Sequence, residues 1–140
     1  MPDGLITSVS YISTARSDLE ISDFQDILDS ANLRNEELGL TGLLAFNGLN
    51  FMQILEGARN DVNSCIRLIE GDKRHEGMVI FDRRDVPRRE FPDWKMAGVL
   101  LNQAEADFEL AIDELLSSEW VNPETRKHFE SFQSFGSPAE

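Results

Sequence analysis

The sequence predicts a single domain of the α+β class, in which one sheet carries helices on both of its faces. Three patterns lead to this expectation: short apolar or β-branched runs, amphipathic helical segments between them, and two further amphipathic stretches near the C-terminus. A chain of 140 residues is long enough to bury about 68% of the surface that its unfolded form exposes, so one hydrophobic core suffices.

A strand signal followed by a helix signal occupies the first part of the chain. Residues 5–13 form a run rich in β-branched side chains, which indicates a strand. Ser22 and Gln25 then have the spacing of a capping box, so a helix is predicted to start there and to end near residues 32–39. Its apolar stripe, at helical spacing, consists of Phe24, Ile27, Leu28 and Ala31.

The clearest local signal is a β-hairpin around Asn47-Gly48. Asn-Gly adopts the positive φ angles of a tight turn, and apolar runs at 41–46 and 49–56 flank it. Because side chains alternate along a strand, the second run is predicted to divide into two faces. One face holds Phe51, Gln53 and Leu55, and the other holds Met52, Ile54 and Glu56.

A second helix and two more strands complete the predicted sheet. Asn60 is the expected cap of the helix. Strands are predicted at 78–81 and 94–101, with a basic loop containing Pro87 and Pro92 between them. The apolar stripe of the helix consists of Val62, Cys65, Ile66 and Ile69. The resulting order, βαββαβ with a fifth strand, is that of a ferredoxin-like fold, an antiparallel sheet with both helices on one face.

The tail is predicted to supply two C-terminal helices that cover the opposite face of the sheet. Residues 108–116 carry an apolar stripe, and Asn122-Pro123 is a cap followed by proline at the first helical position of a helix that runs to about residue 132. The expected anchors of this last helix are Phe129, Phe132 and Phe135. We therefore expect residues 1–101 to form the main domain and residues 102–140 an extension within the same globular unit. The extension either simply covers the core or serves as a regulated or dimer-forming element.

The charge balance excludes two classes of partner. The chain has 13 Lys and Arg against 26 Asp and Glu, a formal charge of −13. Direct nucleic-acid binding and attachment to an anionic membrane both need a basic surface, so neither is expected. Seven of the basic residues fall between Lys73 and Lys95, and residues 105–119 hold six acids and no base. These runs are either solvated surfaces or complementary patches used in self-association.

Several chemistries lack the residues that they need. The single Cys65 rules out an internal disulfide framework and a multi-cysteine zinc site, and its place on an apolar stripe predicts a buried structural thiol. The sequence shows no signal peptide and no apolar run of about 18 residues, which predicts a cytoplasmic protein. It also has no P-loop and no GxSxG or HExxH motif, so neither an enzyme nor a metal site is expected.

Polar side chains interrupt otherwise apolar segments. Tyr11 and Ser13 share one face of the first strand, and Asn35 is expected just past the first helix. Gln53 lies amid apolar neighbours. Because the helices share one face of the sheet, Tyr11, Gln53 and Asn35 are candidates to converge on a polar cleft between sheet and helices. A buried glutamine needs partners for both its amide donor and its carbonyl acceptor, since an unpaired group costs about 1–3 kcal/mol.

Five short motifs resemble those of one known family. They are Tyr11-x-Ser13, Asn35 with Leu40-Thr41-Gly42-Leu43-Leu44, Phe51-Met52-Gln53-Ile54-Leu55-Glu56-Gly57, Asp72-Lys73-Arg74-His75 and Phe91-Pro92-x-Trp94-x-Met96. In this order, over about residues 5–101, the chain resembles the BLUF domains, which are blue-light sensors that use FAD. The resemblance implies a flavin ring held edge-on to the sheet, between the two helices.

The resemblance also implies a role for the residues at the centre of the site. Tyr11 matches the tyrosine that gives an electron and then a proton to the excited flavin. Gln53 matches the glutamine between that tyrosine and the flavin N5/O4 edge, whose amide rotates or tautomerises and leaves a small red shift in absorption. An amide suits this role because turning it over reverses its hydrogen bonds without adding charge. Asn35 matches the residue that hydrogen-bonds the flavin carbonyl edge.

Further cofactor contacts and a signal route are implied by the same resemblance. Those around the ring are Ile27 on its face, Phe51 at its edge, and Asp72 and Arg74 on its other side. Trp94 and Met96 match fifth-strand residues that carry the change across the sheet, and Ser13 matches a position that tunes it. Arg34 departs from the family, in which many members have Asn or His at this position. The arginine is expected to reach either a flavin oxygen or a phosphate.

The expected function is therefore that of a stand-alone blue-light photoreceptor, with no appended cyclase or phosphodiesterase domain. Its output is expected to pass through the sheet and the tail to a homo-oligomer, either a dimer or a larger assembly, or to a separate protein partner. The alternative is a light-silent, ferredoxin-like anion- or ligand-binding module, or an acylphosphatase-like enzyme, because many functions share the βαββαβ order. That alternative needs an anion site built on Arg34 or Arg74.

Overall fold

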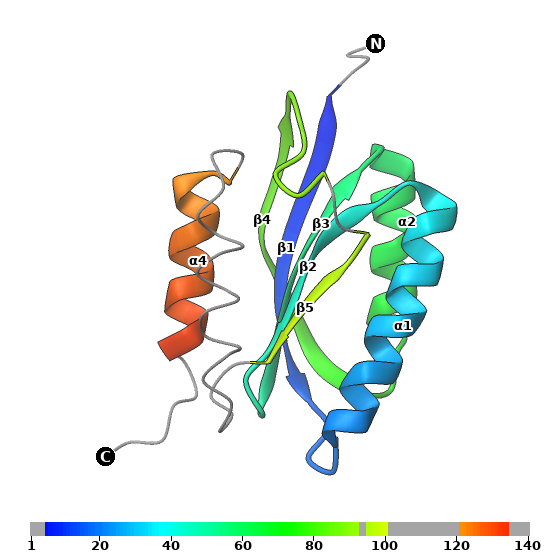
Figure 1. Ribbon diagram of the computed structural model, residues 1–140, viewed down its shortest axis with the longest axis vertical. Coiled ribbons are helices and arrows are strands. Elements are labelled where there is room, and N and C mark those ends of the chain that lie inside the picture. Colours follow the sequence, from blue (N-terminus) through cyan, green and yellow to red (C-terminus); the bar gives the residue numbers. More distant parts are fainter. Residues whose placement is uncertain (1–4, 93–94, 101–120, 135–140) are drawn as a thin grey trace.

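A five-stranded sheet forms the centre of the computed structural model, which describes residues 5–92, 95–100 and 121–134 (Figure 1). Its strands lie side by side in the order β4-β1-β3-β2-β5. They are β1 (Ile6–Ala15), β2 (Thr41–Phe46), β3 (Asn50–Gly57), β4 (His75–Val86) and β5 (Ala97–Leu100). The described helices are α1 (Ile21–Leu38), α2 (Arg59–Glu70) and α4 (Pro123–Ser134). The α+β class and the order βαββαβ with a fifth strand, both predicted from the sequence, are confirmed.

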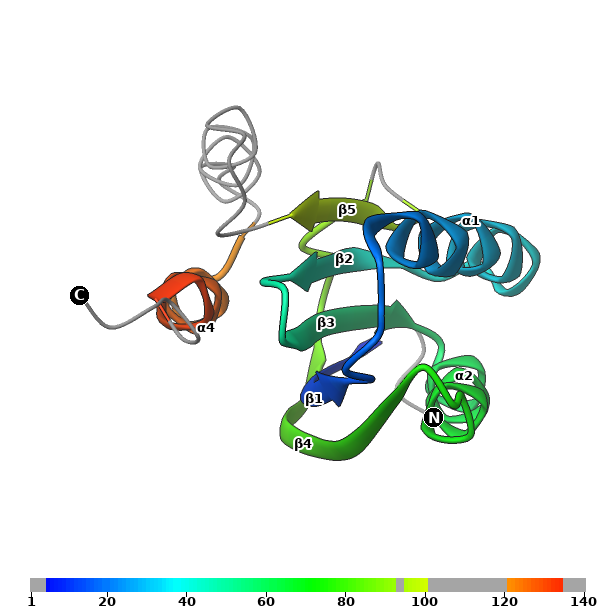
Figure 2. The same ribbon diagram turned by 90° about the horizontal axis from the view of Figure 1, so that it is seen from below.

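The helices lie on both faces of the sheet. Figure 2 shows α1 and α2 against one face and α4 on the opposite side. Both placements agree with the prediction from the sequence. The first of the two predicted C-terminal helices (108–116) and the predicted anchor Phe135 lie outside the described residues. Within the described ranges, no helix is both long enough and apolar enough to span a membrane.

The sheet is mixed, whereas the sequence predicted an antiparallel one. The pairs β1–β3, β1–β4 and β2–β3 are antiparallel, but β5 runs parallel to β2. The connection after β4 leaves one edge of the sheet and reaches the opposite edge, so no tight hairpin sets the direction of β5. β5 also begins later than predicted. Met96 therefore precedes the strand, although the sequence prediction placed it inside a strand at 94–101.

The helices begin before their predicted caps. α1 is capped by Glu20, whose backbone N–H donates to the Asp23 carboxylate at 2.8 Å, rather than by Ser22. α2 is capped by Ala58 rather than by Asn60. Because a cap contributes only about 1 kcal/mol, the packing of the apolar stripe decides where each helix starts.

α1 also extends further than predicted. It continues through Asn35, which the sequence placed just past the helix, and ends before Gly39. The positive φ of Gly39, 70°, forms a left-handed C-cap that an L side chain rarely adopts. Asn35 is therefore a buried residue of the last helical turns.

β4 is longer than the predicted strand at 78–81. It includes the charged residues 82–85, which pair with the first half of β1. Because β4 is an edge strand, charged side chains can project from it without being buried. The basic pair Arg83-Arg84 therefore lies in the sheet and not in a loop.

The predicted hairpin is confirmed. Asn47 Oδ1 accepts hydrogen bonds from the backbone N–H groups of Leu49 and Asn50, at 2.9 and 2.7 Å. Gly48 takes a positive φ of 96°, as the turn requires. This turn sets the register of β2 against β3 and places Leu44 opposite Gln53.

Two hydrophobic cores hold the layers together. The core beneath α1 and α2 includes Phe24, Leu44, Phe51, Leu55, Val62 and Ile66. The core beneath α4 includes Leu43, Met52, Ile54, Val99, Phe129 and Phe132. β3 contributes to both cores in the alternation that the sequence predicted. The predicted anchors Phe129 and Phe132 are buried.

A buried carboxylate fixes the connection between β4 and β5. Glu56, on the α4 side of β3, accepts the backbone N–H groups of Glu90 and Phe91, both at 2.7 Å. The Thr41 hydroxyl donates to it as well, at 2.9 Å. Burial raises the pKa of Glu56 above its usual value. Glu90 in turn accepts the backbone N–H of Asn122 at 2.7 Å, so the start of α4 is tied through this connection to β3.

Replacing Phe129 with alanine tests the docking of α4. The Phe129 ring is fully buried, so Phe129→Ala is expected to lower the free energy of unfolding by about 3–5 kcal/mol in urea denaturation. Lys127→Ala, on the exposed side of the same helix, is the control and should change it by less than about 0.5 kcal/mol. Equal urea midpoints for the two variants would show that α4 does not pack into the hydrophobic core.

Candidate functional site

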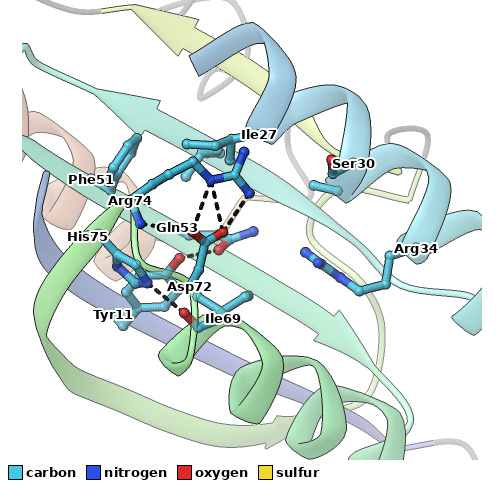
Figure 3. Close-up of a pocket in the computed structure, with 12 residues that line it drawn as sticks. Tyr11, Ile27, Ser30, Arg34, Phe51, Gln53, Ile69, Asp72, Arg74 and His75 are labelled. Carbon is cyan, nitrogen blue, oxygen red and sulfur yellow. Dashed lines mark hydrogen bonds and ion pairs between the residues drawn. The ribbon is translucent and has the colours of Figure 1, made fainter. Parts of the chain in front are cut away.

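A pocket lies between the sheet and the two helices α1 and α2 (Figure 3). Strands β1, β2 and β3 form its floor, α1 forms one wall, and the end of α2 with the start of β4 forms the other. The lining residues are Tyr11, Ile27, Ser30, Ala31, Arg34, Leu44, Phe51, Gln53, Ile69, Asp72, Arg74 and His75. Most floor residues are apolar, whereas the two walls carry most of the polar and charged side chains.

A short hydrogen bond joins Tyr11 and Gln53 in the floor of the pocket. The two residues lie directly opposite each other in β1 and β3, and the Tyr11 hydroxyl donates to Gln53 Oε1 at 2.5 Å. Both side chains are buried, with 3% and 2% exposure. Burial raises the pKa of the Tyr11 hydroxyl far above its usual value. The phenol is therefore a neutral donor throughout the physiological range.

The other end of the Gln53 amide faces Met96. Gln53 Nε2 donates to Met96 Sδ at 3.6 Å, a contact with a weak acceptor. Met96 is 4% exposed and reaches this position from the segment just before β5. Trp94, the other predicted relay residue, lies outside the described residues.

Two polar atoms on α1 are buried without a hydrogen-bond partner in the described structure. They are Arg34 Nε and Asn35 Oδ1. Arg34 extends from α1 into the pocket (Figure 3), whereas Asn35 lies behind the wall and donates from Nδ2 to the Lys95 carbonyl at 2.6 Å. Because an unpaired buried polar group is costly, Arg34 Nε, in the lining of the pocket, indicates that the site is completed by a molecule with polar groups of its own.

The opposite wall carries an ion pair. The Asp72 carboxylate accepts from Arg74 Nε at 2.9 Å and from Arg74 Nη2 at 2.6 Å. The hydrogen bonds from Arg74 hold the pKa of Asp72 below its usual value. Because Arg74 is already paired with a carboxylate, it is poorly suited to the anion site that the alternative function needs.

His75 connects three elements beside the pocket. Its Nδ1 lies 2.7 Å from Ser13 Oγ, and its Nε2 lies 2.6 Å from the carbonyl oxygen of Ile69. A neutral ring protonated at Nε2 satisfies both contacts, by donating to Ile69 and accepting from the Ser13 hydroxyl. Ser13 does not line the pocket, but its side chain contacts the lining residue His75.

The predicted site residues fall into three groups. Seven line one pocket: Tyr11, Ile27, Arg34, Phe51, Gln53, Asp72 and Arg74. Ser13, Asn35 and Met96 lie behind its walls, and Trp94 is not described. Sequence reasoning missed the lining residues Ser30, Ala31, Leu44, Ile69 and His75. The positions of Ser30 and Ala31 were detectable, since both fall between Ile27 and Arg34 on one helical face.

Cys65 lies in the core beneath α1 and α2 and does not line the pocket. Cys65 is a free, fully buried thiol, and burial raises its pKa. It is therefore a structural residue, as the sequence predicted. In the part of the chain that the structure describes, no three His, Cys, Asp or Glu side chains are grouped to hold a metal ion.

The fold and the pocket together define a ligand-binding α+β domain with a tyrosine–glutamine pair in the floor of its cleft. Residues 6–97 match the model of the family described as BLUF, sensors of blue-light using FAD. The chain belongs to the BLUF family, and it is a flavin-binding blue-light photoreceptor domain.

Similar proteins carry this domain in different settings. The chain is 34% identical over 87 residues to the blue light- and temperature-regulated antirepressor BluF of Escherichia coli, and 32% identical over 98 residues to the photoactivated adenylate cyclase subunit beta of Euglena longa. These matches cover 62% and 69% of this chain but span only 22% and 11% of those proteins.

Solved structures show the same arrangement. BlrP1 of Klebsiella pneumoniae superposes with a TM-score of 0.80 at 32% identity, over 94% of this chain and 33% of that one. The dark-state structure of the BLUF protein BlrB gives a TM-score of 0.71 at 31% identity, over 94% of this chain and 97% of that one.

The residues present fit a flavin. Its ring has two apolar faces and an edge of carbonyl oxygens and ring nitrogens, and the pocket offers apolar side chains such as Leu44, Phe51 and Ile27 together with polar groups on its walls. The unpaired Arg34 Nε, which lines the pocket, is a donor suited to such an edge. The buried Tyr11–Gln53 pair adds further hydrogen-bonding groups in the floor.

The raised pKa of Tyr11 predicts unusual behaviour in alkali. Tyr11 is the single tyrosine of the chain, so the 13C resonance of tyrosine Cζ reports on it alone. In the folded protein the phenol should remain protonated well above pH 10, about where an ordinary tyrosine ionises. The unfolded chain in urea is the control and should titrate near that value.

The same shift predicts a loss of stability at high pH. Above about pH 10 the unfolded chain releases the tyrosine proton while the folded chain retains it, so the free energy of unfolding falls as pH rises. Reversible ionisation near pH 10 in a chain that is still folded would contradict the burial of Tyr11.

Proposed function

We propose that this chain signals blue light through a rearrangement of the hydrogen bonds around Tyr11 and Gln53. The observation that carries the proposal is the buried bond from the Tyr11 hydroxyl to Gln53 Oε1, in the pocket of a BLUF fold. The flavin, when bound, supplies the absorption of blue light. The contribution of the chain is a donor–acceptor pair with a second possible arrangement.

Reversal of the Gln53 amide gives this second arrangement. In the structure Oε1 accepts from Tyr11 and Nε2 faces Met96 Sδ. After reversal, Nε2 donates to the Tyr11 oxygen and Oε1 faces the sulfur. No charge is created, so both arrangements are compatible with a buried site. Met96 favours the first arrangement because its sulfur accepts hydrogen bonds but cannot donate them.

The remaining pocket residues are proposed to hold and orient FAD. Ile27 and Phe51 form apolar contacts with the ring, and the Asp72–Arg74 pair borders its far side. Arg34 Nε is assigned to a flavin oxygen, because it is a buried cationic donor without a partner in the described structure. Asn35 Oδ1 is also an unpaired acceptor, but Asn35 does not line the pocket, so contact with a ring N–H requires its side chain to turn toward the cleft.

The output is proposed to be a change in protein association, not catalysis by this chain. In this account residues 1–101 are the flavin-binding domain, and residues 102–140 are a helical extension that receives the change through Met96, β5 and α4. Light must then alter the relative stability of two arrangements of a homo-oligomer, or of a complex with a separate protein. The relative named an antirepressor supports a protein partner.

Absorption spectra in the dark and after blue light test the proposed photochemistry. FAD-loaded protein should show a flavin spectrum that shifts slightly to the red in light and returns in darkness. Tyr11→Phe and Gln53→Leu should each abolish the shift, because each removes one side of the hydrogen bond. Gln25→Leu is the control, since Gln25 donates to Asp29 on the exposed side of α1. An unshifted flavin spectrum, or retention of the shift in Gln53→Leu, would contradict the proposal.

Hydrogen exchange tests the proposed route to α4. Met96→Leu should keep the flavin shift while weakening the light-dependent change in amide exchange at residues 123–134, because the contact with Gln53 is lost. Met78→Leu serves as the matched control, since this half-buried methionine packs against the same core from β4, which does not pair with β3. Equal light-induced exchange in Met96→Leu and the wild type would count against this route.

A further inference from the structure

The segment that carries Met96 is tied to α1 by two asparagine side chains. Asn35 Nδ2 donates to the Lys95 carbonyl at 2.6 Å, and Asn32 Nδ2 donates to the next carbonyl, that of Met96, at 3.2 Å. The same Asn32 amide also donates to the Leu28 carbonyl in its own helix, at 2.9 Å. The Asn32 amide is therefore held both by its own helix and by the segment before β5.

Close packing leaves this segment little freedom. A Cβ atom at Gly98 would lie 2.3 Å from Leu28 Cδ2, so β5 rests directly against α1. A Cβ atom at Gly42 would lie 3.3 Å from Met96 Cε and 2.0 Å from the Ile54 carbonyl oxygen, so the Met96 methyl occupies space that only glycine leaves open. Asn32 thus holds the backbone of Met96, and the close contact with Gly42 limits the movement of its side chain.

We propose that Asn32 is a positioning residue that keeps Met96 Sδ on the Gln53 amide and thereby sets which way round the amide lies. The proposal rests on the function proposed above, in which Gln53 reverses. A sulfur held at 3.6 Å from Nε2 accepts from that nitrogen; after reversal it would face Oε1, which offers it no proton. Asn32 does not line the pocket, so it acts on Gln53 only through Met96.

Two substitutions separate the hydrogen bond from the helix that carries it. Asn32→Leu keeps a side chain of similar size, removes the donor and raises helix propensity. Asn32→Asp is nearly isosteric and, when ionised, offers acceptors only. Gln25→Leu is the control, because it removes an amide from the exposed side of the same helix.

The readout is the methyl resonance of Met96 in FAD-loaded protein labelled at the methionine methyl carbons. The chain has four methionines, and Met96→Leu identifies the signal. Both Asn32 variants should move the Met96 signal in the dark and leave that of Met52, in the other core, in place. They should also change the rate of return after illumination by about two- to ten-fold, the effect of losing one hydrogen bond. Gln25→Leu should change neither.

Two results would overturn the inference. One is an unmoved Met96 signal with a return rate like that of the wild type. The other is an equal displacement of Met52 and Met96, which would mean that Asn32 merely stabilises the whole domain. The dark comparison does not depend on photochemistry. A wild-type protein without a light-induced shift would therefore refute the proposed function, while the Met96 signal would still decide the role of Asn32.

Discussion

The hydrogen bond between Tyr11 and Gln53 is the interaction on which the site depends. It joins two neighbouring strands inside the core, where an unsatisfied hydroxyl or amide would be costly. The bond forms because the β1–β3 register places the two residues opposite each other. A slip of one residue would turn Gln53 toward α4 and remove it from the pocket. The register of the sheet is therefore a condition for the photochemistry as well as for the fold.

β3 connects the two sides of the molecule. Gln53 faces the pocket beneath α1 and α2, and Glu56, three residues later, faces α4 and holds the backbone at residues 90–91. That connection holds the start of α4 through Glu90, and further along the chain it presents Met96 to Gln53. A single strand thus contacts both the site of the proposed change and the segment that links it to the C-terminal helix. This arrangement gives a change at Gln53 a short physical path to the opposite face.

The sequence predicted those features that depend on interactions between residues close together in the chain. The Asn47-Gly48 turn, the two faces of β3 and the buried anchors Phe129 and Phe132 were all readable from the sequence, because turn chemistry and periodicity act over a few residues. The predicted helix caps, Ser22 and Asn60, were wrong, since tertiary packing outweighs a weak capping preference. The charged half of β4 and the parallel pairing of β5 were missed, because edge position and a long connection are properties of the whole sheet. For the same reason the partners of Glu56 and the amide contact of Asn32 with Met96, which join segments far apart in the chain, had no sequence signal.

The orientation of the Gln53 side-chain amide is the central claim, and NMR of its 15N-labelled NH2 group in FAD-loaded protein measures it directly. Gln53→Leu identifies the signal. The account predicts that blue light moves the Gln53 NH2 resonances, as the nitrogen leaves Met96 Sδ for the Tyr11 oxygen, and that they return at the same rate as the flavin absorption. A flavin shift that appears and decays while the Gln53 resonances stay in place would contradict it.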